Sequence, residues 1–425
     1  MIKRDDYVNK LISLIGNRHI KVITGIRRSG KSVLLFELFY DYLITKGIKD
    51  KNIIKIELDK AKDYEYRNPL ELYNYIKEAM DMNVEEKYFL FIDEIQMARV
   101  HTIKKKDYKD EVTIFDVLNE LKDYKNLDVY VTGSNSKMLS SDIVSEFRGR
   151  SSQIHVYPFS FKEFYSFKKG DINKALNEYM LYGGLPRLIE IENIEEKMDY
   201  LKNLFKEVYL KDLIERKKIT KEDILNNLLD LLSSSISSLT NPNKIANILT
   251  SINKEKIDSN LINKYIEHLK DVFLINEAKR FDIKGKKYFE YPNKYYFIDV
   301  GLRNARLNFR QFDQGHIMEN IIYNELIKRG YSVDIGVVYD RKNNNNTPKE
   351  IDFVVNYNDK KIYIQSAFEI GDEEKLDSET SSFKLTNDFF KKIVIRDDIM
   401  HNYYDENGFF HCNLIDFLLD KVNLF

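Results

Sequence analysis

The sequence predicts an α/β protein built from more than one domain. In the first 165 residues, short apolar runs alternate with longer amphipathic stretches, a pattern typical of a parallel sheet covered by helices on both faces. Helical spacing dominates from about residue 161 to 232, and a second α/β unit begins near residue 311. The strands expected in the first part are "IKVITG", "IIKIEL", "YFLFIDE", "LDVYVTG" and "QIHVYPF".

Composition and charge narrow the class of protein. The 425 residues include 67 Lys and Arg against 68 Asp and Glu, so we expect no overall attraction to nucleic acid or membranes, and any basic surface must be local. The single cysteine, Cys412, cannot form an internal disulfide or a thiolate metal cluster, which fits a reducing compartment. The charged start and the lack of an apolar run near the roughly 20 residues of a membrane span predict a cytoplasmic protein.

The most specific motif is "GIRRSGKS", which matches G-x-x-x-x-G-K-[ST] between an expected strand and an amphipathic helix. Its glycines let backbone N–H groups close around phosphate oxygens, while Lys31 reaches the terminal phosphates and Ser32 ligates magnesium. We therefore predict a site for a nucleotide with Mg²⁺. Its expected contacts are Gly25, Ile26, Arg27, Arg28, Ser29, Gly30, Lys31, Ser32 and Val33.

An acidic pair follows about sixty residues later, where "YFLFIDE" ends in Asp93 and Glu94. Asp93 can hold Mg²⁺ through water, and Glu94 can polarise the water that attacks the γ-phosphate. The alternative is a strand that ends in a solvated acidic turn. Beside a phosphate loop, the additional glutamate favours hydrolysis of ATP over a small-molecule kinase.

Two later motifs carry polar residues that can act on a phosphate. The strand in "VYVTGSNS" ends near Ser134 and Asn135, which either face the γ-phosphate or form an ordinary turn. Arg148 and Arg150 precede the next strand, and an arginine supplied by a neighbouring subunit can neutralise transition-state charge. That interpretation predicts a homo-oligomer. The alternative is a pair of surface arginines that bridge acids.

The order of "GIRRSGKS", "FIDEIQ", "VTGSNS", "FRGR" and "VYPFSFKEF" resembles the AAA+ ATPase domain of a widespread prokaryotic family of predicted ATPases. In that family a winged-helix segment and a C-terminal PD-(D/E)xK restriction-endonuclease-like domain follow. The resemblance implies a P-loop AAA+ domain (residues 1–165), a helical lid (166–235), a winged helix (236–310) and a nuclease-like α/β domain (311–425). It also implies catalytic roles for Lys31 and Glu94, a metal site at Ser32 and Asp93, a sensor at Ser134, and a finger at Arg148 or Arg150.

"YGGLPRL" matches the Gly-Gly-x-Pro of the family's lid. Arg187 in this segment would be a second sensor if it faced ATP, and otherwise part of the lid surface. Arg27 and Arg28 resemble paired basic residues of the family. They either contact phosphates or bind acids of the lid or of a neighbour.

The segment from 239 to 300 is expected to form two helices and a hairpin, which resembles a winged helix. Basic residues on the hairpin can contact the phosphates of duplex DNA. The alternatives are a protein-binding module and a sheet edge protected by lysines. The candidate DNA contacts are Lys279, Arg280, Lys284, Lys286 and Lys287.

The C-terminal segment matches the order of a PD-(D/E)xK site, with Glu319 on a helix and Asp352 on a strand. By that match Gln365 takes the place of the second acid, and Ala367 takes the place of the lysine that would orient water. We therefore expect an inactive, nuclease-like domain. A weak nuclease that uses Glu319 and Asp352 is the alternative.

These patterns predict an Mg-dependent AAA+ ATPase that couples nucleotide state to domain rearrangement and associates with DNA. Its predicted ligands are ATP and Mg²⁺, and its predicted partners are duplex DNA and further copies of the chain. Two alternatives stay open: an ATP-regulated nuclease, and a nucleotide-switched scaffold with little turnover.

Overall fold

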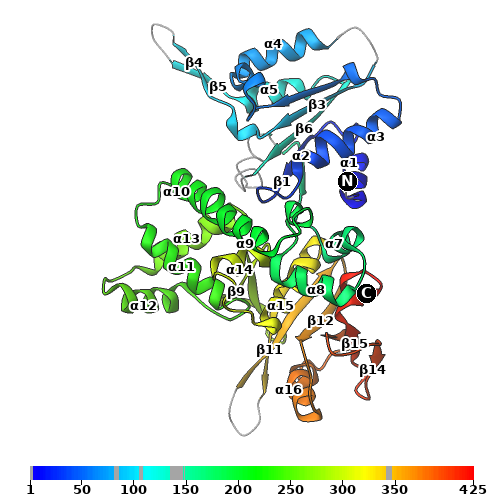
Figure 1. Cartoon of the computed structure of the whole chain (residues 1–425), viewed down its shortest axis with the longest axis vertical. Coiled ribbons are helices and arrows are strands. Elements are labelled where there is room, and N and C mark those ends of the chain that lie inside the picture. The colour runs from blue at the N-terminus through cyan, green and yellow to red at the C-terminus, as the bar shows by residue number, and fades with distance from the viewer. Residues whose placement is uncertain (1–2, 81–85, 105–108, 135–146, 148, 341–346) are drawn as a thin grey trace. The chain divides into compact units, whose positions relative to one another are not determined.

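A computed structural model describes residues 3–80, 86–104, 109–134, 147, 149–340 and 347–425 (Figure 1). The chain divides into two compact units, which comprise residues 1–157 with 271–273 and residues 158–270 with 274–425. No helix within the described ranges is both long and apolar enough to cross a membrane.

The N-terminal unit contains a parallel five-stranded sheet in the order β2-β3-β6-β1-β7. All five strands expected from the sequence are present, which confirms the predicted α/β class. The strands are β1 (Ile20–Thr24), β2 (Ile53–Glu57), β3 (Tyr88–Asp93), β6 (Leu127–Gly133) and β7 (Ser151–His155), and a separate hairpin pairs β4 (His101–Lys104) with β5 (Lys109–Val112).

The helices of this unit are mostly short. The α-helices are α1 (Asp5–Ser13), α2 (Lys31–Val33), α3 (Tyr40–Thr45), α4 (Pro69–Ala79) and α5 (Ile114–Leu121). A π-helical segment (Leu34–Phe39) joins α2 to α3. Short 3₁₀ turns cover Asp50–Asn52, Ala61–Asp63, Glu65–Arg67 and Ile95–Met97.

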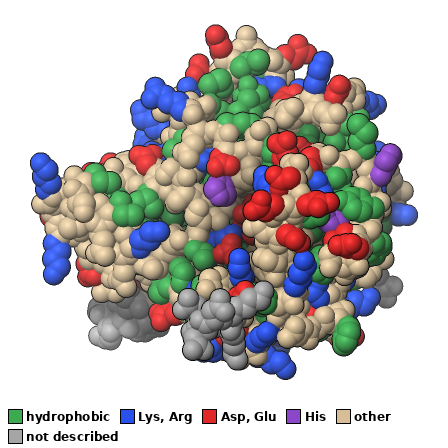
Figure 2. Space-filling view, turned by 90° about the horizontal axis from the view of Figure 1, so that it is seen from below, with side chains coloured by type: hydrophobic (Ala, Val, Ile, Leu, Met, Phe, Trp, Pro, Cys, Tyr) green, Lys and Arg blue, Asp and Glu red, His purple; other side chains and the backbone are tan. Residues whose placement is uncertain are grey.

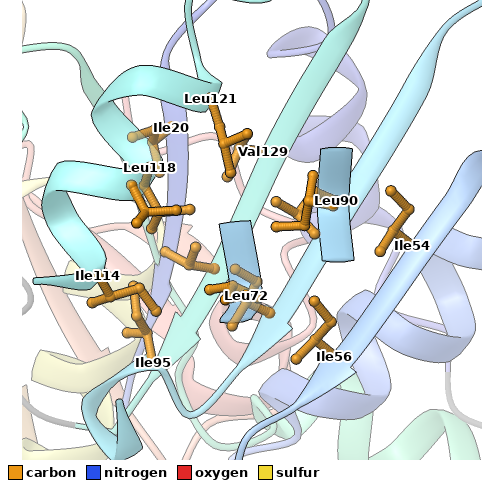
Figure 3. Packing of buried hydrophobic residues seen from close by; sticks show 14 of the residues in the cluster. Ile20, Ile54, Ile56, Leu72, Leu90, Ile95, Ile114, Leu118, Leu121 and Val129 are labelled. Carbon is orange, nitrogen blue, oxygen red and sulfur yellow. The ribbon is translucent and has the colours of Figure 1, made fainter. Parts of the chain in front are cut away.

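The inner strands of the sheet contribute residues to two different hydrophobic cores, one on each face. In β3, Leu90 and Ile92 pack with α4 and α5, as Figure 3 shows for Leu90 beside Leu72. Phe89 and Phe91 point to the opposite face and pack with α1 and the helical segment after the phosphate loop. Each such burial stabilises the fold by about 1.5–3 kcal/mol. Since both faces are covered, ligands can approach the strands only at an edge, and in such sheets they bind outside the carboxyl ends.

The second unit begins with a helical segment. Its helices are α7 (Phe161–Lys168), α8 (Ile172–Tyr182), a 3₁₀ turn (Pro186–Ile189), α9 (Ile194–Asn203), a π-helical segment (Leu204–Leu210), α10 (Lys211–Lys217), α11 (Glu222–Ser234), α12 (Pro242–Asn253) and α13 (Ser259–Asp271). The later helices are α14 (Val300–Arg306), α15 (Gln314–Lys328), α16 (Glu373–Lys384) and α17 (Leu414–Leu418).

An eight-stranded mixed sheet completes this unit, in the order β14-β15-β13-β12-β11-β10-β8-β9. Its strands are β8 (Ile275–Asp282), β9 (Lys287–Phe297), β10 (Ser332–Asp340), β11 (Thr347–Tyr357), β12 (Lys360–Ala367), β13 (Lys391–Arg396), β14 (Tyr403–Tyr404) and β15 (Phe410–Asn413).

The expected hairpin is present as β8 and β9, and it forms one edge of the C-terminal sheet. Strand β8 pairs in parallel with β10, where Phe281 lies opposite Gly336. A Cβ on Gly336 would come within 3.0 Å of Val354, Ile351 and Ile283, so the missing side chain permits the close packing. The boundary expected at residue 310 therefore does not separate the strands. The strand propensity of this segment predicted the hairpin, but it could not predict that β8 would pair with β10, which is distant in sequence.

The Gly-Gly pair expected in a lid packs instead against the start of α14. The Gly184 N–H donates to Asp299 Oδ2 at 2.8 Å, and a Cβ on Gly184 would lie 2.2 Å from the Phe159 carbonyl oxygen. Asp299 is fully buried, and burial raises its pKa to about 6. The side chain also caps α14 by accepting from the Leu302 N–H at 3.2 Å. Packing thus accounts for both glycines.

Candidate nucleotide-binding site

The carboxyl ends of three neighbouring strands bring the predicted motifs together. Strand β6 lies between β1 and β3 and pairs in parallel with both. The phosphate loop follows β1, Asp93 ends β3, and Ser134 directly follows β6. Parallel strands end at the same edge, so the loop, the acidic pair and Ser134 belong to one site.

The phosphate loop has the backbone geometry that phosphate binding requires. Gly25 has φ 143°, and a Cβ there would lie 2.2 Å from the Val156 carbonyl oxygen. Gly30 has φ 90° and immediately precedes α2, which begins at Lys31. The loop therefore ends at a helix N-terminus, where free N–H groups and the helix dipole favour an anion.

Lys31 is a buried cation held inside the loop. Its ammonium donates to the carbonyl oxygens of Gly25 and Ile26 at 3.0 and 3.1 Å. Burial lowers its pKa from 10.5 to about 8, an effect that the nearby carboxylates of Glu94 and Asp93 partly offset. Carbonyl dipoles compensate only part of the lost hydration, so the ammonium is poised for the stronger charge of a phosphate.

Ser32 and Asp93 supply oxygen ligands at the same place. The Ser32 hydroxyl donates to Asp93 Oδ2 at 2.7 Å, and the Thr132 hydroxyl of β6 donates to Oδ1. Hydroxyl and carboxylate oxygens suit Mg²⁺, which usually takes its remaining ligands from phosphates and water. Within the described residues no three His, Cys, Asp or Glu side chains are placed to hold a metal by themselves. The residues present therefore fit a magnesium ion that arrives with the nucleotide.

Glu94 is oriented by a small polar network. Its backbone is left-handed, with φ 51°, and its N–H donates to Thr132 Oγ1 at 3.2 Å. The Ser134 hydroxyl donates to Glu94 Oε2 at 3.2 Å, and the Gln96 amide donates to the same oxygen. A left-handed backbone at a residue other than glycine is strained and persists only where the surrounding structure holds it. Such residues are common at functional sites. Gln96 was not identified from the sequence.

The predicted arginines are less well placed. Arg150 is exposed, and its Nη1 lies 3.8 Å from Asp123 Oδ1, which fits the alternative of a surface pair. Arg187 is exposed and pairs with Glu190 one turn away. These contacts add little stability.

Burial and backbone geometry describe two further predicted positions. Arg27 is half-buried, and Arg28 is exposed with φ 65°. Asn135 and Arg148 lie outside the described residues.

Arg4 is a residue of the site that sequence analysis missed. It is 4% exposed, and its guanidinium donates to the carbonyl oxygens of Ser29 at 2.9 Å and Tyr157 at 2.8 Å. The guanidinium also lies 4.4 Å from the centroid of the Tyr7 ring. One side chain thus ties the phosphate loop to the chain after β7. No motif marked Arg4, because it stands in a charged N-terminal segment far from the loop in sequence.

The other predicted sites lie in the second unit. Lys279, Lys284, Lys286 and Lys287 are exposed, while Arg280 is half-buried and stacks 5.3 Å from the Phe289 ring centroid. Glu319, Asp352 and Gln365 are buried. Ala367 is part of a hydrophobic core, as a plain strand residue would be.

Comparisons with known proteins agree with the N-terminal site. A family model described as an AAA domain matches residues 17–165, and two models described as domains of unknown function (DUF8612 and DUF4143) match residues 173–313 and 314–412. A Walker-type ATPase of Pyrococcus abyssi shares the fold, with a TM-score of 0.51 at 16% identity over 72% of this chain and 96% of that one. The N-terminal unit is therefore an ATP-binding domain of the AAA+ ATPase class.

Two uncharacterized proteins are similar along almost the whole chain. One, from Haemophilus influenzae, is 34% identical over 427 residues, which cover 99% of both chains. The other, from Methanocaldococcus jannaschii, is 30% identical over 409 residues, 91% of this chain and 84% of that protein. The chain belongs to the family of these proteins. The AAA+ resemblance is confirmed, whereas the winged helix and the nuclease-like domain stay predictions.

The pKa of Lys31 predicts how ATP binding depends on pH. Phosphates bind the charged ammonium, and with a pKa of about 8 in the free protein, Lys31 becomes mostly neutral as the pH rises above 8. Binding must then take up a proton, so the Kd for ATP should be nearly constant around pH 7 and rise toward about tenfold per pH unit above pH 8. Titration calorimetry in buffers of different ionisation enthalpy measures both the Kd and the proton uptake.

The matched control for this pH dependence is Lys31→Arg, whose guanidinium stays charged throughout. Its affinity for ATP, even if weaker, should not change across the same range. Wild-type binding at about pH 9 without proton uptake would contradict the prediction.

Substitution of Arg4 tests its role as a positioning residue. Arg4→Ala removes two charge-assisted hydrogen bonds from buried carbonyls, and we expect the Kd for ATP to rise by roughly 10- to 100-fold. Arg4→Lys retains the charge but lacks the forked donor group, so its Kd for ATP should lie between those of the wild type and Arg4→Ala. Calorimetry gives the affinities, and the exposed Lys51→Ala serves as control. A lower melting temperature with unchanged affinity in Arg4→Ala would reduce Arg4 to a structural role.

Proposed function

We propose that the protein is an Mg-dependent ATPase whose nucleotide state alters the arrangement of its units. The observation that carries this proposal is the 2.7 Å hydrogen bond between Ser32 and Asp93, with Glu94 directly beside it. In this scheme Lys31 contacts the terminal phosphates, and Ser32 and Asp93 hold Mg²⁺. When bound, Mg²⁺ offsets the charge on the phosphate oxygens.

Glu94 is the residue proposed to activate water. Ser134 and Gln96 both donate to Glu94 Oε2, so they hold the carboxylate in one orientation and leave Oε1 to accept from a water. Ser134 follows β6, the strand between the loop and the acidic strand. A phosphate that attracts the Ser134 hydroxyl would therefore change the hydrogen bonding of Glu94. This arrangement supports Ser134 as the sensor.

Glu94→Gln separates turnover from binding. The amide keeps the size of the side chain but cannot accept a proton, so ATPase activity should fall by roughly 10²- to 10⁴-fold while ATP still binds. Phosphate release and calorimetry on the full chain measure the two properties. Glu71→Gln, at an exposed position of α4, should leave both unchanged.

The same experiment tests the scaffold alternative. If the wild-type protein shows no activity with DNA and at high protein concentration, and Glu94→Gln changes nothing, the turnover proposal fails. A nucleotide-switched scaffold then remains.

A second proposal is that duplex DNA contacts the exposed turn of the β8–β9 hairpin. Lys284, Lys286 and Lys287 cluster at that turn and are all exposed. Figure 2 shows acidic and basic side chains interspersed over the face it presents, as expected from a formal net charge of −1. The basic turn is therefore a local feature of the kind that phosphate contacts need. Glu267 of α13 and the hairpin residues Glu277 and Glu290 line one pocket farther from the turn, where their negative charge would oppose a phosphate.

Salt dependence tests the DNA proposal. Each phosphate contact releases counterions, so the triple change of Lys284, Lys286 and Lys287 to Ala should reduce the slope of log Kd against log salt by about 3. Fluorescence anisotropy with a short duplex measures this slope. Replacement of Lys46, Lys51 and Lys77 by Ala removes the same charge from exposed positions of the N-terminal unit and is the control. Affinity that is insensitive to salt or to the triple change would eliminate the idea.

A further inference from the structure

A buried lysine lies among the carboxylates of the predicted degenerate nuclease site. The ammonium of Lys294 in β9 is 2.9 Å from Glu319 Oε1, 2.6 Å from Glu350 Oε1 and 3.8 Å from Asp352 Oδ1. Its side chain is only 4% exposed. Glu319 belongs to α15, whereas Glu350 and Asp352 belong to β11. One cation therefore joins three elements that are distant in sequence.

Other groups of the chain occupy the remaining positions around these acids. The Tyr296 hydroxyl donates to Glu319 Oε1 at 2.6 Å, and the Ser366 N–H donates to Asp352 Oδ2 at 2.8 Å. Gln365 faces the same strand, where its Oε1 accepts from the Asp352 N–H at 3.3 Å. The cluster is satisfied by internal donors, as a buried polar network must be to avoid a large penalty.

A divalent metal ion does not fit this cluster as it stands. Mg²⁺ or Ca²⁺ needs several oxygen ligands at about 2.0–2.6 Å, but the oxygens here converge on an ammonium group. Across the described residues, no set of three His, Cys, Asp or Glu is arranged to hold a metal. Glu319 and Asp352 have side chains only 10% exposed, so they offer little surface to a phosphodiester. A nuclease site would need both the metal and that access.

We propose that Lys294 is the permanent cation of this cluster and takes the place of a divalent metal ion. The ammonium offsets part of the charge of the acids that a nuclease-like fold would direct at its metal, and it connects the β8–β9 hairpin to α15 and β11. The C-terminal sheet then has a structural role. This inference concerns only the second unit and does not rest on the ATPase proposal.

The test compares the full chain with its Lys294→Met variant, in the absence of nucleotide. Loss of the ammonium leaves buried carboxylates without a partner, so we expect the melting temperature to fall by roughly 6–15 °C. Addition of Mn²⁺ should recover part of this loss in Lys294→Met, because the freed oxygens can bind it, and should not shift the wild-type protein. The exposed Lys375→Met, on α16 of the same unit, is the matched control and should behave as wild type.

A double variant keeps the test decisive if Lys294→Met does not fold. Lys294→Met with Glu319→Gln removes one charge of each sign, so it should be more stable than Lys294→Met and respond less to Mn²⁺, because only Glu350 and Asp352 of the three acids remain. Two results would overturn the proposal. One is a rise in the wild-type melting temperature with Mn²⁺ that Asp352→Asn abolishes. The other is Mn²⁺- or Mg²⁺-dependent nicking of a plasmid that Asp352→Ala abolishes, which would make Lys294 the lysine of a working nuclease.

Discussion

The carboxylate of Asp93 connects the parts of the N-terminal site. One of its oxygens accepts from Ser32 at the start of α2, and the other accepts from Thr132 on β6. Because Asp93 itself ends β3, the two hydrogen bonds join the ends of three adjacent strands. Burial raises the pKa of Asp93, while these two hydroxyl donors lower it. The helix that follows the phosphate loop and the strand that precedes Ser134 are thus both bonded to one side chain.

Two buried lysines show how the groups around an ammonium determine the direction of its pKa shift. Burial tends to lower the pKa of both. For Lys31, bonded to two backbone carbonyls, the pKa falls to about 8. For Lys294 the carboxylates of Glu319, Asp352 and Glu350 outweigh burial and raise the pKa above its ordinary value. The first ammonium is incompletely compensated and suits an incoming phosphate. The second ammonium already forms ion pairs with carboxylates of the same unit, so it suits a structural role.

The parts of the predicted N-terminal site come together in the fold because each part is local in sequence. The phosphate loop, the acidic pair and Ser134 each follow an apolar strand, and parallel pairing places such strand ends at one edge. Arg4 and Gln96 could not be predicted in this way, since their roles depend on hydrogen bonds that no spacing encodes. The same limit applies to Lys294. The sequence shows that Ala367 stands where a nuclease lysine would be expected. It does not show that Lys294 on β9 lies among Glu319, Glu350 and Asp352, because β9 joins the C-terminal sheet through the pairing of β8 with β10.

The route by which nucleotide state could reach the second unit begins at the phosphate loop. The chain leaves the N-terminal unit after Tyr157. The Arg4 guanidinium donates hydrogen bonds to the carbonyl oxygens of both Tyr157 and the loop residue Ser29. A Cβ on Gly25 would lie 2.2 Å from the carbonyl oxygen of Val156, the residue before Tyr157. The phosphate loop and the end of the N-terminal unit are therefore in close contact. In the proposed function, a phosphate that shifts the loop would therefore also act on this segment. Within that unit, Asp299 bonds the Gly183–Gly184 turn to α14, so the helical segment and the sheet respond as one body. Under the proposed coupling, the Gly183–Gly184 turn and α14 would therefore take part together.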